Sequence, residues 1–210
     1  MLTIRPPTRS ARRSRGITLN VGGFILAGGR SSRFGSDKST SFFGSDRLID
    51  RVISALQPHV AHVTIVGGDA HVASSRGLTH LQDEVAHEGP WAAIKNVALR
   101  CSDDVFIFAP CDLPLLTSAS VGVLRQTAID CGVALLASDE MAHWSVSGWT
   151  RERLLVAVEM ARDTGARSLR AAIEPLEPAY IRVPSSEMIN VNTPDDLAEA
   201  EQHLAHWKDD

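Results

Sequence analysis

The sequence has few cysteines and no long apolar run. Its 210 residues include Cys101, Cys111 and Cys131, which cannot all pair with one another, and none of them stands in a CxxC motif. No apolar run approaches the roughly 18 residues that a membrane span needs. These features argue against a disulfide framework and a transmembrane protein. We therefore expect reduced thiols in a cytoplasmic protein that has no membrane partner.

Acidic residues are absent from the first 20 residues, although the chain as a whole has a formal net charge of -4. This segment carries five arginines and two adjacent prolines, so we predict a disordered basic tail over residues 1–20. Arg12-Arg13 resembles a twin-arginine signal, but no apolar segment follows it, which argues against export. The rest of the chain has 16 basic against 25 acidic residues, which disfavours a nucleic-acid interface over the body. A nucleic-acid binder that uses the arginine tail stays as a minor alternative.

What the sequence does have is a regular alternation of apolar runs and helical patterns. Short apolar runs predict strands over residues 22–27, 63–66, 78–82, 105–109, 133–137 and 180–183. Helical spacing predicts helices over residues 46–56, 90–99, 118–129, 151–162, 166–173 and 194–206. Residues 143–149 alternate and predict an edge or antiparallel strand, and Thr150 and Thr193 stand where helix N-caps are expected. The alternation predicts one α/β domain over residues 21–210, with a mostly parallel sheet in three layers and ligands at the carboxyl ends of its strands.

The first candidate site is the loop AGGRSSRFGSDK, which follows the first predicted strand over Ala27–Lys38. Glycines let backbone N–H groups approach a ligand closely, and Arg30, Arg33 and Lys38 add positive charge, a combination that suits a polyphosphate. The loop has neither the GK[ST] of a Walker A motif nor a GxGxxG pattern. A glycine-rich turn with surface cations is the alternative.

A second loop places a carboxylate directly after an apolar strand. In FAPCDLPLL, Asp112 lies between Pro110 and Pro114, which stiffen the loop. One carboxylate at this edge suits Mg²⁺, which often takes one or two carboxylates together with substrate phosphates. An N-cap or turn aspartate is the alternative.

Two further loops complete the set. DEVAHEGPWAAI places acids and a Gly-Pro pair at the start of a predicted helix. In MINVNTPDDL, Thr193 and Asp196 have the spacing of a capping box. That structural role does not account for Asn190 and Asn192.

Together the four segments resemble the molybdenum cofactor guanylyltransferases. The family pattern is LAGG…RMG.DK, D…GPLAG, PCD.P.L and N.NTP..L, and this chain has LAGGRSSRFGSDKS, DEVAHEGPWAAI, APCDLPLL and INVNTPDDL in the same order. Gly28-Gly29 and Asp37-Lys38 favour the guanylyl branch over the cytidylyltransferases, whose loop resembles LAAG…RMG…K. The resemblance implies an α/β/α sandwich of Rossmann type, as in the nucleotide-diphospho-sugar transferases. It also implies a Mg²⁺-dependent enzyme that transfers GMP from GTP to the phosphate of molybdopterin and releases pyrophosphate.

The resemblance assigns roles to particular residues as well. The catalytic residues would be Lys38, Arg33 and Asp112. The nucleotide would be bound by Leu26, Ala27, Gly28, Gly29, Lys38, Asp83 and Asp112. Asp112 and Asn192 would hold Mg²⁺, and Asn190 and Trp144 would lie on the acceptor side. A partner that inserts molybdenum, or a molybdoenzyme that receives the finished cofactor, is left open.

The chain departs from the family pattern at three segments. After the second predicted strand, Val66-Gly67-Gly68-Asp69 stands where the family often offers asparagine-type contacts to the base. GPWAA replaces GPLAG, so Ala93 stands in place of a glycine, and HWSVSGW replaces the acceptor-side QP or HP motifs. Trp144 and Trp149 would either stack on a pterin or pack in the core. Transfer from CTP or to another phosphorylated acceptor therefore stays open, as does a non-catalytic nucleotide-binding homologue.

Overall fold

The structure, a computed structural model, describes residues 18–28, 42–82, 89–139 and 141–208. The predicted tail lies almost wholly outside these residues. Asn20 is described, and its side-chain amide donates to Asp103 Oδ1 at 3.0 Å. Its N–H donates to Asp104 Oδ2 at 2.8 Å, so the chain is fixed just before the first strand begins.

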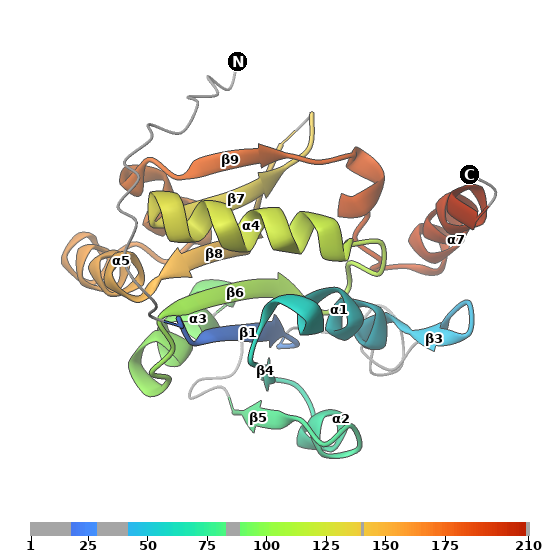
Figure 1. Ribbon diagram of the computed structural model, residues 1–210, viewed down its shortest axis with the longest axis horizontal. Coiled ribbons are helices and arrows are strands. Elements are labelled where there is room, and N and C mark those ends of the chain that lie inside the picture. The colour runs from blue at the N-terminus through green and yellow to red at the C-terminus, as the bar shows by residue number, and fades with distance from the viewer. Residues whose placement is uncertain (1–17, 29–41, 83–88, 140, 209–210) are drawn as a thin grey trace.

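Seven strands of the described residues form a central sheet in the order β5-β4-β1-β6-β8-β7-β9 (Figure 1). The strands are Val21–Leu26 (β1), His62–Val66 (β4), Thr79–Leu81 (β5), Val105–Pro110 (β6), Val133–Ala137 (β7), Ala142–Thr150 (β8) and Ala179–Arg182 (β9). All pairings in the sheet are parallel except the two that β8 makes. The mostly parallel sheet predicted from the sequence is confirmed.

Helices cover both faces of the sheet, which gives the predicted three layers (Figure 1). One face carries α1 (Leu48–Leu56), α2 (Ala70–Ser74) and α4 (Ser118–Cys131). The other face carries α3 (Pro90–Arg100), α5 (Arg151–Thr164) and α6 (Leu169–Ile173). The last helix, α7 (Pro194–Lys208), packs beside the small hairpin formed by β2 (Phe42–Phe43) and β3 (Asp46–Arg47). Single turns of 3₁₀ helix span Gln57–His59, Glu174–Leu176 and Ser185–Met188.

The two cores follow from the period of two along each strand. Successive side chains of a strand point to opposite faces of the sheet. Phe24, Phe106 and Phe108 therefore lie together on the face of α3, with ring centroids 5.4 to 6.4 Å apart. Ile25 and Ile107 lie on the face of α1 and α4. Strands buried on both faces read as continuous apolar runs, which is why they were predictable.

The predicted N-caps have different outcomes. Thr193 Oγ1 accepts from the N–H of Asp196 at 3.2 Å, and Asp196 Oδ2 accepts from the N–H of Thr193 at 2.8 Å. This reciprocal pair confirms the capping box at the start of α7. Thr150 stands at the N-cap position of α5 but makes no side-chain cap; its hydroxyl donates to Gly132 O at 3.4 Å.

Residues 143–149 were predicted to form either an edge strand or an antiparallel strand. The strand is antiparallel and does not lie at an edge of the sheet. β8 is inserted between β6 and β7, where Trp149 pairs with Phe106 on one side and Val133 on the other. Gly148 lets α4 pack closely on this strand, since an added Cβ would lie 2.8 Å from Ala128 Cβ. The sequence did not predict α2 or the β2–β3 hairpin, which are too short to show a period.

Candidate nucleotide site at the carboxyl edge of the sheet

The four loops singled out in the sequence follow parallel strands or return to the same edge. Leu26, the last residue of β1, pairs with Val66 at the end of β4 and with Pro110 at the end of β6. Val66 in turn pairs with Leu81, the last residue of β5. The carboxyl ends of these strands are therefore level, and the prediction that their loops share one edge is confirmed.

The glycine-rich loop begins at this edge against a second pair of glycines. The N–H of Ala27 donates to Val66 O at 2.9 Å, so that amide is used within the sheet and a backbone cradle would begin at Gly28, which is exposed. Gly68 has a φ of +68°, and an added Cβ would lie 3.1 Å from Ala27 O. The sequence analysis interpreted the Gly67-Gly68 pair as the end of a strand and as a departure from the family's base contacts, and the structure shows that Gly68 lies directly against Ala27 at the start of the loop. Leu26 itself is buried, which leaves only its backbone at the edge.

Several predicted site residues lie outside the described residues. They are Gly29, Arg33, Lys38 and Asp83. Their assigned roles stay predictions.

Asp112 and Asn190 come together although they are far apart in the sequence. Cys111 N–H donates to Leu26 O at 3.2 Å, which places half-buried Asp112 directly beside the end of β1. The side-chain amide of Asn190, oriented with its nitrogen toward the carboxylate, donates to both Asp112 Oδ1 and Oδ2 at 2.6 Å. The N–H of Val191 donates to Asp112 O at 2.9 Å. The loop after β6 and the segment before α7 thus form one polar surface at the carboxyl edge.

Asn192 occupies a different position from Asn190. It is exposed, and its side-chain amide donates to Asn190 O at 3.3 Å. Its own N–H donates to Asp196 Oδ2 at 2.7 Å, as part of the start of α7. The sequence assigned Asn192 to the metal and Asn190 to the acceptor, whereas the structure places the Asn190 side chain against the Asp112 carboxylate.

The two tryptophans of β8 have separate environments. Trp149 is fully buried, and its Nε1 donates to Ser147 Oγ at 2.9 Å, so it packs in the core and does not face a ligand. Trp144 is half-buried and lies edge-on to Tyr180, with ring centroids 6.4 Å apart. Burial raises the pKa of Tyr180 above its usual value. Of these two tryptophans, Trp144 keeps the surface exposure that pterin stacking requires.

A polar cluster that the sequence analysis missed joins the β7–β8 turn to β8. His143 Nε2 lies 3.1 Å from Ser138 Oγ, and burial lowers the pKa of His143 below its usual value. Because β8 runs opposite to β7, this turn returns the chain to the same edge as Asp112. The only sequence signal was the alternation over residues 143–149, which does not show how far the side chain of His143 is buried.

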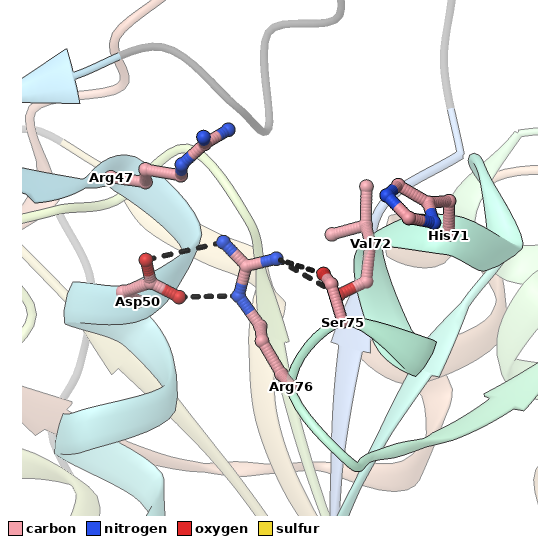
Figure 2. Close-up of a pocket in the computed structure, with 6 residues that line it drawn as sticks. All are labelled: Arg47, Asp50, His71, Val72, Ser75 and Arg76. Atoms are coloured by element: carbon pink, nitrogen blue, oxygen red, sulfur yellow. Dashed lines mark hydrogen bonds and ion pairs between the residues drawn. The ribbon is translucent and has the colours of Figure 1, made fainter.

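A cavity of about 390 Å³ lies between α1 and α2 (Figure 2). Arg76 pairs with both carboxylate oxygens of Asp50 across it and donates to Val72 O at 2.9 Å. Arg47, at the N-cap position of α1, lies above this pair, and His71 lines the opposite side. Arg47 and Arg76 thus place two cationic side chains at this cavity, near the start of α1, which the sequence analysis did not single out.

The chain matches the family model described as the MobA-like NTP transferase domain over residues 23–179. The chain belongs to this family. It is 30% identical over 178 residues to the molybdenum cofactor guanylyltransferase of Xanthomonas euvesicatoria, which covers 82% of this chain and 90% of that protein. It is 27% identical to the molybdenum cofactor guanylyltransferase of Pseudomonas syringae, with 81% and 88% of the two chains covered.

Solved structures agree on the fold. The molybdopterin-guanine dinucleotide biosynthesis protein A of Archaeoglobus fulgidus superposes with a TM-score of 0.66 at 20% identity, covering 88% of this chain and 99% of that chain. The 2-C-methyl-D-erythritol 4-phosphate cytidylyltransferase of Thermus thermophilus superposes with a TM-score of 0.64 at 15% identity, covering 89% and 98%. This MobA-like NTP transferase is thus an enzyme of the nucleotidyltransferase class, with the nucleotide-diphospho-sugar transferase fold. Among its described residues, no helix is both long and apolar enough to cross a lipid bilayer.

Proposed function

We propose that this nucleotidyltransferase transfers GMP from GTP to the phosphate of molybdopterin and releases pyrophosphate, with Mg²⁺ as its cofactor. The observation that carries the proposal is the position of Asp112. This carboxylate follows the central strand β6, lies beside the end of β1 and contacts Asn190 at the edge where the glycine-rich loop begins. Membership of a family with molybdenum cofactor guanylyltransferases among its relatives supports the choice of substrates.

The residues present fit Mg²⁺ as a cofactor shared with the nucleotide. Asp112 offers a half-buried carboxylate, and an Asn190 amide turned over would offer an oxygen in the same place. The described residues hold no group of three or more His, Cys, Asp or Glu that could bind a metal ion. Mg²⁺ would therefore keep water and phosphate oxygens among its ligands, as it commonly does when it binds with a nucleotide. When bound, it would stabilise the negative charge that develops on the phosphates during transfer.

The proposed reaction is an in-line displacement at the α-phosphorus of GTP. A phosphate oxygen of molybdopterin forms a bond to that phosphorus, and the bond from the phosphorus to the bridging oxygen of pyrophosphate breaks. The electron pair of the broken bond leaves with pyrophosphate. Arg33 and Lys38 would neutralise the leaving group, and Asp112 would fix the metal end of the triphosphate. An ionised acceptor phosphate needs no general base, so the enzyme would act chiefly by positioning and charge stabilisation.

Mg²⁺-dependent release of pyrophosphate in the presence of molybdopterin tests this proposal. We expect release with GTP, and loss of release in Asp112→Ala and Lys38→Ala. Asp130→Ala is a matched control, because it removes an exposed carboxylate near the end of α4 and should keep full activity. Faster release with CTP than with GTP would move the protein to the cytidylyltransferases. GTP binding without any release would identify a non-catalytic nucleotide-binding homologue.

A further inference from the structure

A buried carboxylate joins the two segments that carry Asp112 and Asn190. Glu187 is only 5% exposed, and it lies in a short 3₁₀ turn between half-buried Ser186 and buried Met188. Its Oε2 accepts two hydrogen bonds from one residue, Thr117: from the N–H at 3.1 Å and from the hydroxyl at 2.9 Å.

Thr117 ends the loop that begins with Asp112. Its Oγ1 also accepts from the N–H of Ser120 at 3.1 Å, so Thr117 is the N-cap of α4. Glu187, on its side, lies three residues before Asn190 in the sequence. The bonds between Thr117 and Glu187 therefore join the last residue of the segment 112–117 to the first residue of the segment 187–190.

Apolar packing makes this tie a rigid one. Leu113 and Leu116 of the first segment lie in the same core cluster as Met188 of the second. Leu115 and Val191 share another cluster, between α7 and the β2–β3 hairpin. With the side chains around them buried, a shift of one segment relative to the other would break the bonds to Glu187, the bond from Val191 N–H to Asp112 O and the Asn190–Asp112 contact.

Glu187 also has no ion pair with a basic side chain of the described residues. A buried carboxylate without a cation partner is costly unless its hydrogen bonds are kept. Thr117 must therefore stay within hydrogen-bond distance of the buried Glu187 carboxylate. Capping of α4 alone does not require Glu187, because the Thr117 hydroxyl already accepts from Ser120 N–H.

We propose that Glu187 is a positioning residue that sets the relative position of Asp112 and Asn190, and with it the affinity of the site for Mg²⁺ and nucleotide. The identity of the ligand in this proposal rests on the proposed function. The relative position of Asp112 and Asn190 does not, because it can be measured in the free protein. Residues that orient a metal ligand without touching the metal typically change metal affinity or activity by about 10- to 100-fold when they are removed.

The test compares Glu187→Ala with Glu187→Gln, whose amide oxygen can still accept both bonds from Thr117. Ser168→Ala is the matched control, because it removes the N-cap of α6, whose Oγ accepts from Ala171 N–H at 3.2 Å, away from the site. In the turnover assay we expect Glu187→Ala to need about 10-fold more Mg²⁺ for half-maximal pyrophosphate release. Glu187→Gln should stay close to the parent, and Ser168→Ala should not change the Mg²⁺ requirement.

Amide hydrogen exchange in the free protein gives the second readout. The reporter is the N–H of Val191, which is bonded to Asp112 O, and we expect its exchange to be about 10-fold faster in Glu187→Ala only. Faster exchange confined to Ser120 and Val121, in the first turn of α4, would mean that Glu187 is a helix cap alone and would overturn the proposal. If Glu187→Ala does not fold, Thr117→Val, which keeps the N–H but loses both the hydroxyl bond to Glu187 and the cap on Ser120 N–H, is compared with Thr117→Ser by the same two readouts. Faster exchange of Val191 N–H in Thr117→Val supports the proposal, and a change confined to Ser120 and Val121 overturns it. If the parent releases no pyrophosphate, the proposed function fails, while the Val191 exchange still decides the role of Glu187.

Discussion

Replacing Asn190 with aspartate would place two carboxylates in direct contact. In the parent protein the Asn190 amide donates to both oxygens of Asp112 at 2.6 Å. Asn190→Asp removes those two bonds and adds a negative charge at nearly the same position. The change in size is small, so packing contributes little, and the effect should be almost entirely electrostatic.

The expected loss of stability follows from the separation of the charges. Two unit charges about 4 Å apart repel by about 1 kcal/mol in water and by about 4 kcal/mol at the effective dielectric constant near a protein surface. Asn190 is exposed and Asp112 is half-buried, so the site lies toward the solvated limit. We expect the free energy of unfolding to fall by about 2 kcal/mol at neutral pH. A protein of this size loses roughly 2–4 °C in Tm for each kcal/mol, so Tm should fall by about 4–8 °C.

Thermal unfolding of Asn190→Asp and Asn192→Asp, with and without Mg²⁺, measures this effect. Asn192→Asp adds the same charge two residues away on an exposed side chain at the start of α7, where the helix dipole favours an anion, so its Tm should change little. A divalent cation between two carboxylates reverses their repulsion, so Mg²⁺ should raise the Tm of Asn190→Asp more than that of the parent. The difference should also shrink at low pH, where carboxyl groups are protonated. Equal Tm values for the two variants, or no dependence on Mg²⁺ and pH, would refute the contact between residues 112 and 190.

Three further predictions concern the scaffold around the site. Gly148→Ala should destabilise the protein by about 1–3 kcal/mol in urea unfolding, because the new methyl group would lie 2.8 Å from Ala128 Cβ; an unchanged midpoint would contradict the close packing of α4 on β8. Gly68→Ala should lower the free energy of unfolding by about 1–2 kcal/mol, because the φ of Gly68 is +68° and Ala27 O lies 3.1 Å from the added Cβ. A nucleotide titration should also show weaker binding in this variant. Stability equal to that of the parent would contradict the described turn. Burial lowers the pKa of His143 from 6.5, so the folded protein binds that proton less tightly than the unfolded chain. This contribution to stability is complete above 6.5 and is lost as the pH falls from 6.5 through the lower pKa of the folded state. His143→Gln should therefore lose less stability between about pH 8 and pH 5 than the parent, and an equal loss would show that the partial burial of His143 does not lower its pKa.

The parts of the fold that were predictable are those that local sequence encodes. β6 reads as a continuous apolar run because it is buried on both faces, and Thr193 with Asp196 gives a capping box from spacing alone. The place of β8 was not predictable in the same way. Alternation over residues 143–149 indicates a strand, but it does not say which strands will pair with it. That choice depends on α4, which packs against Gly148 from across the sheet.

Among the described polar side chains of the site, only the position of the Asp112 carboxylate could be predicted from the sequence. Asp112 follows directly on an apolar strand, so the topology of a parallel sheet places it at the ligand edge. Asn190 and Asn192 stand in irregular backbone, where no period indicates which side chain points toward Asp112. Glu187 gave no signal at all, because a glutamate between serine and methionine reads as a surface residue.

The features that could be predicted and those that could not differ for one physical reason. A parallel sheet brings polar loops to one edge by its topology, so the type of residue and its place after a strand suffice to predict that Asp112 lies there. Which side chains meet at that edge depends on contacts between segments far apart in the chain, such as the bonds from Thr117 to Glu187 and from Val191 to Asp112. Those contacts form only once both segments are packed against the core. The chemistry of the site is therefore carried by residues that local pattern identifies, while its geometry depends on buried polar residues such as Glu187 that local pattern does not reveal.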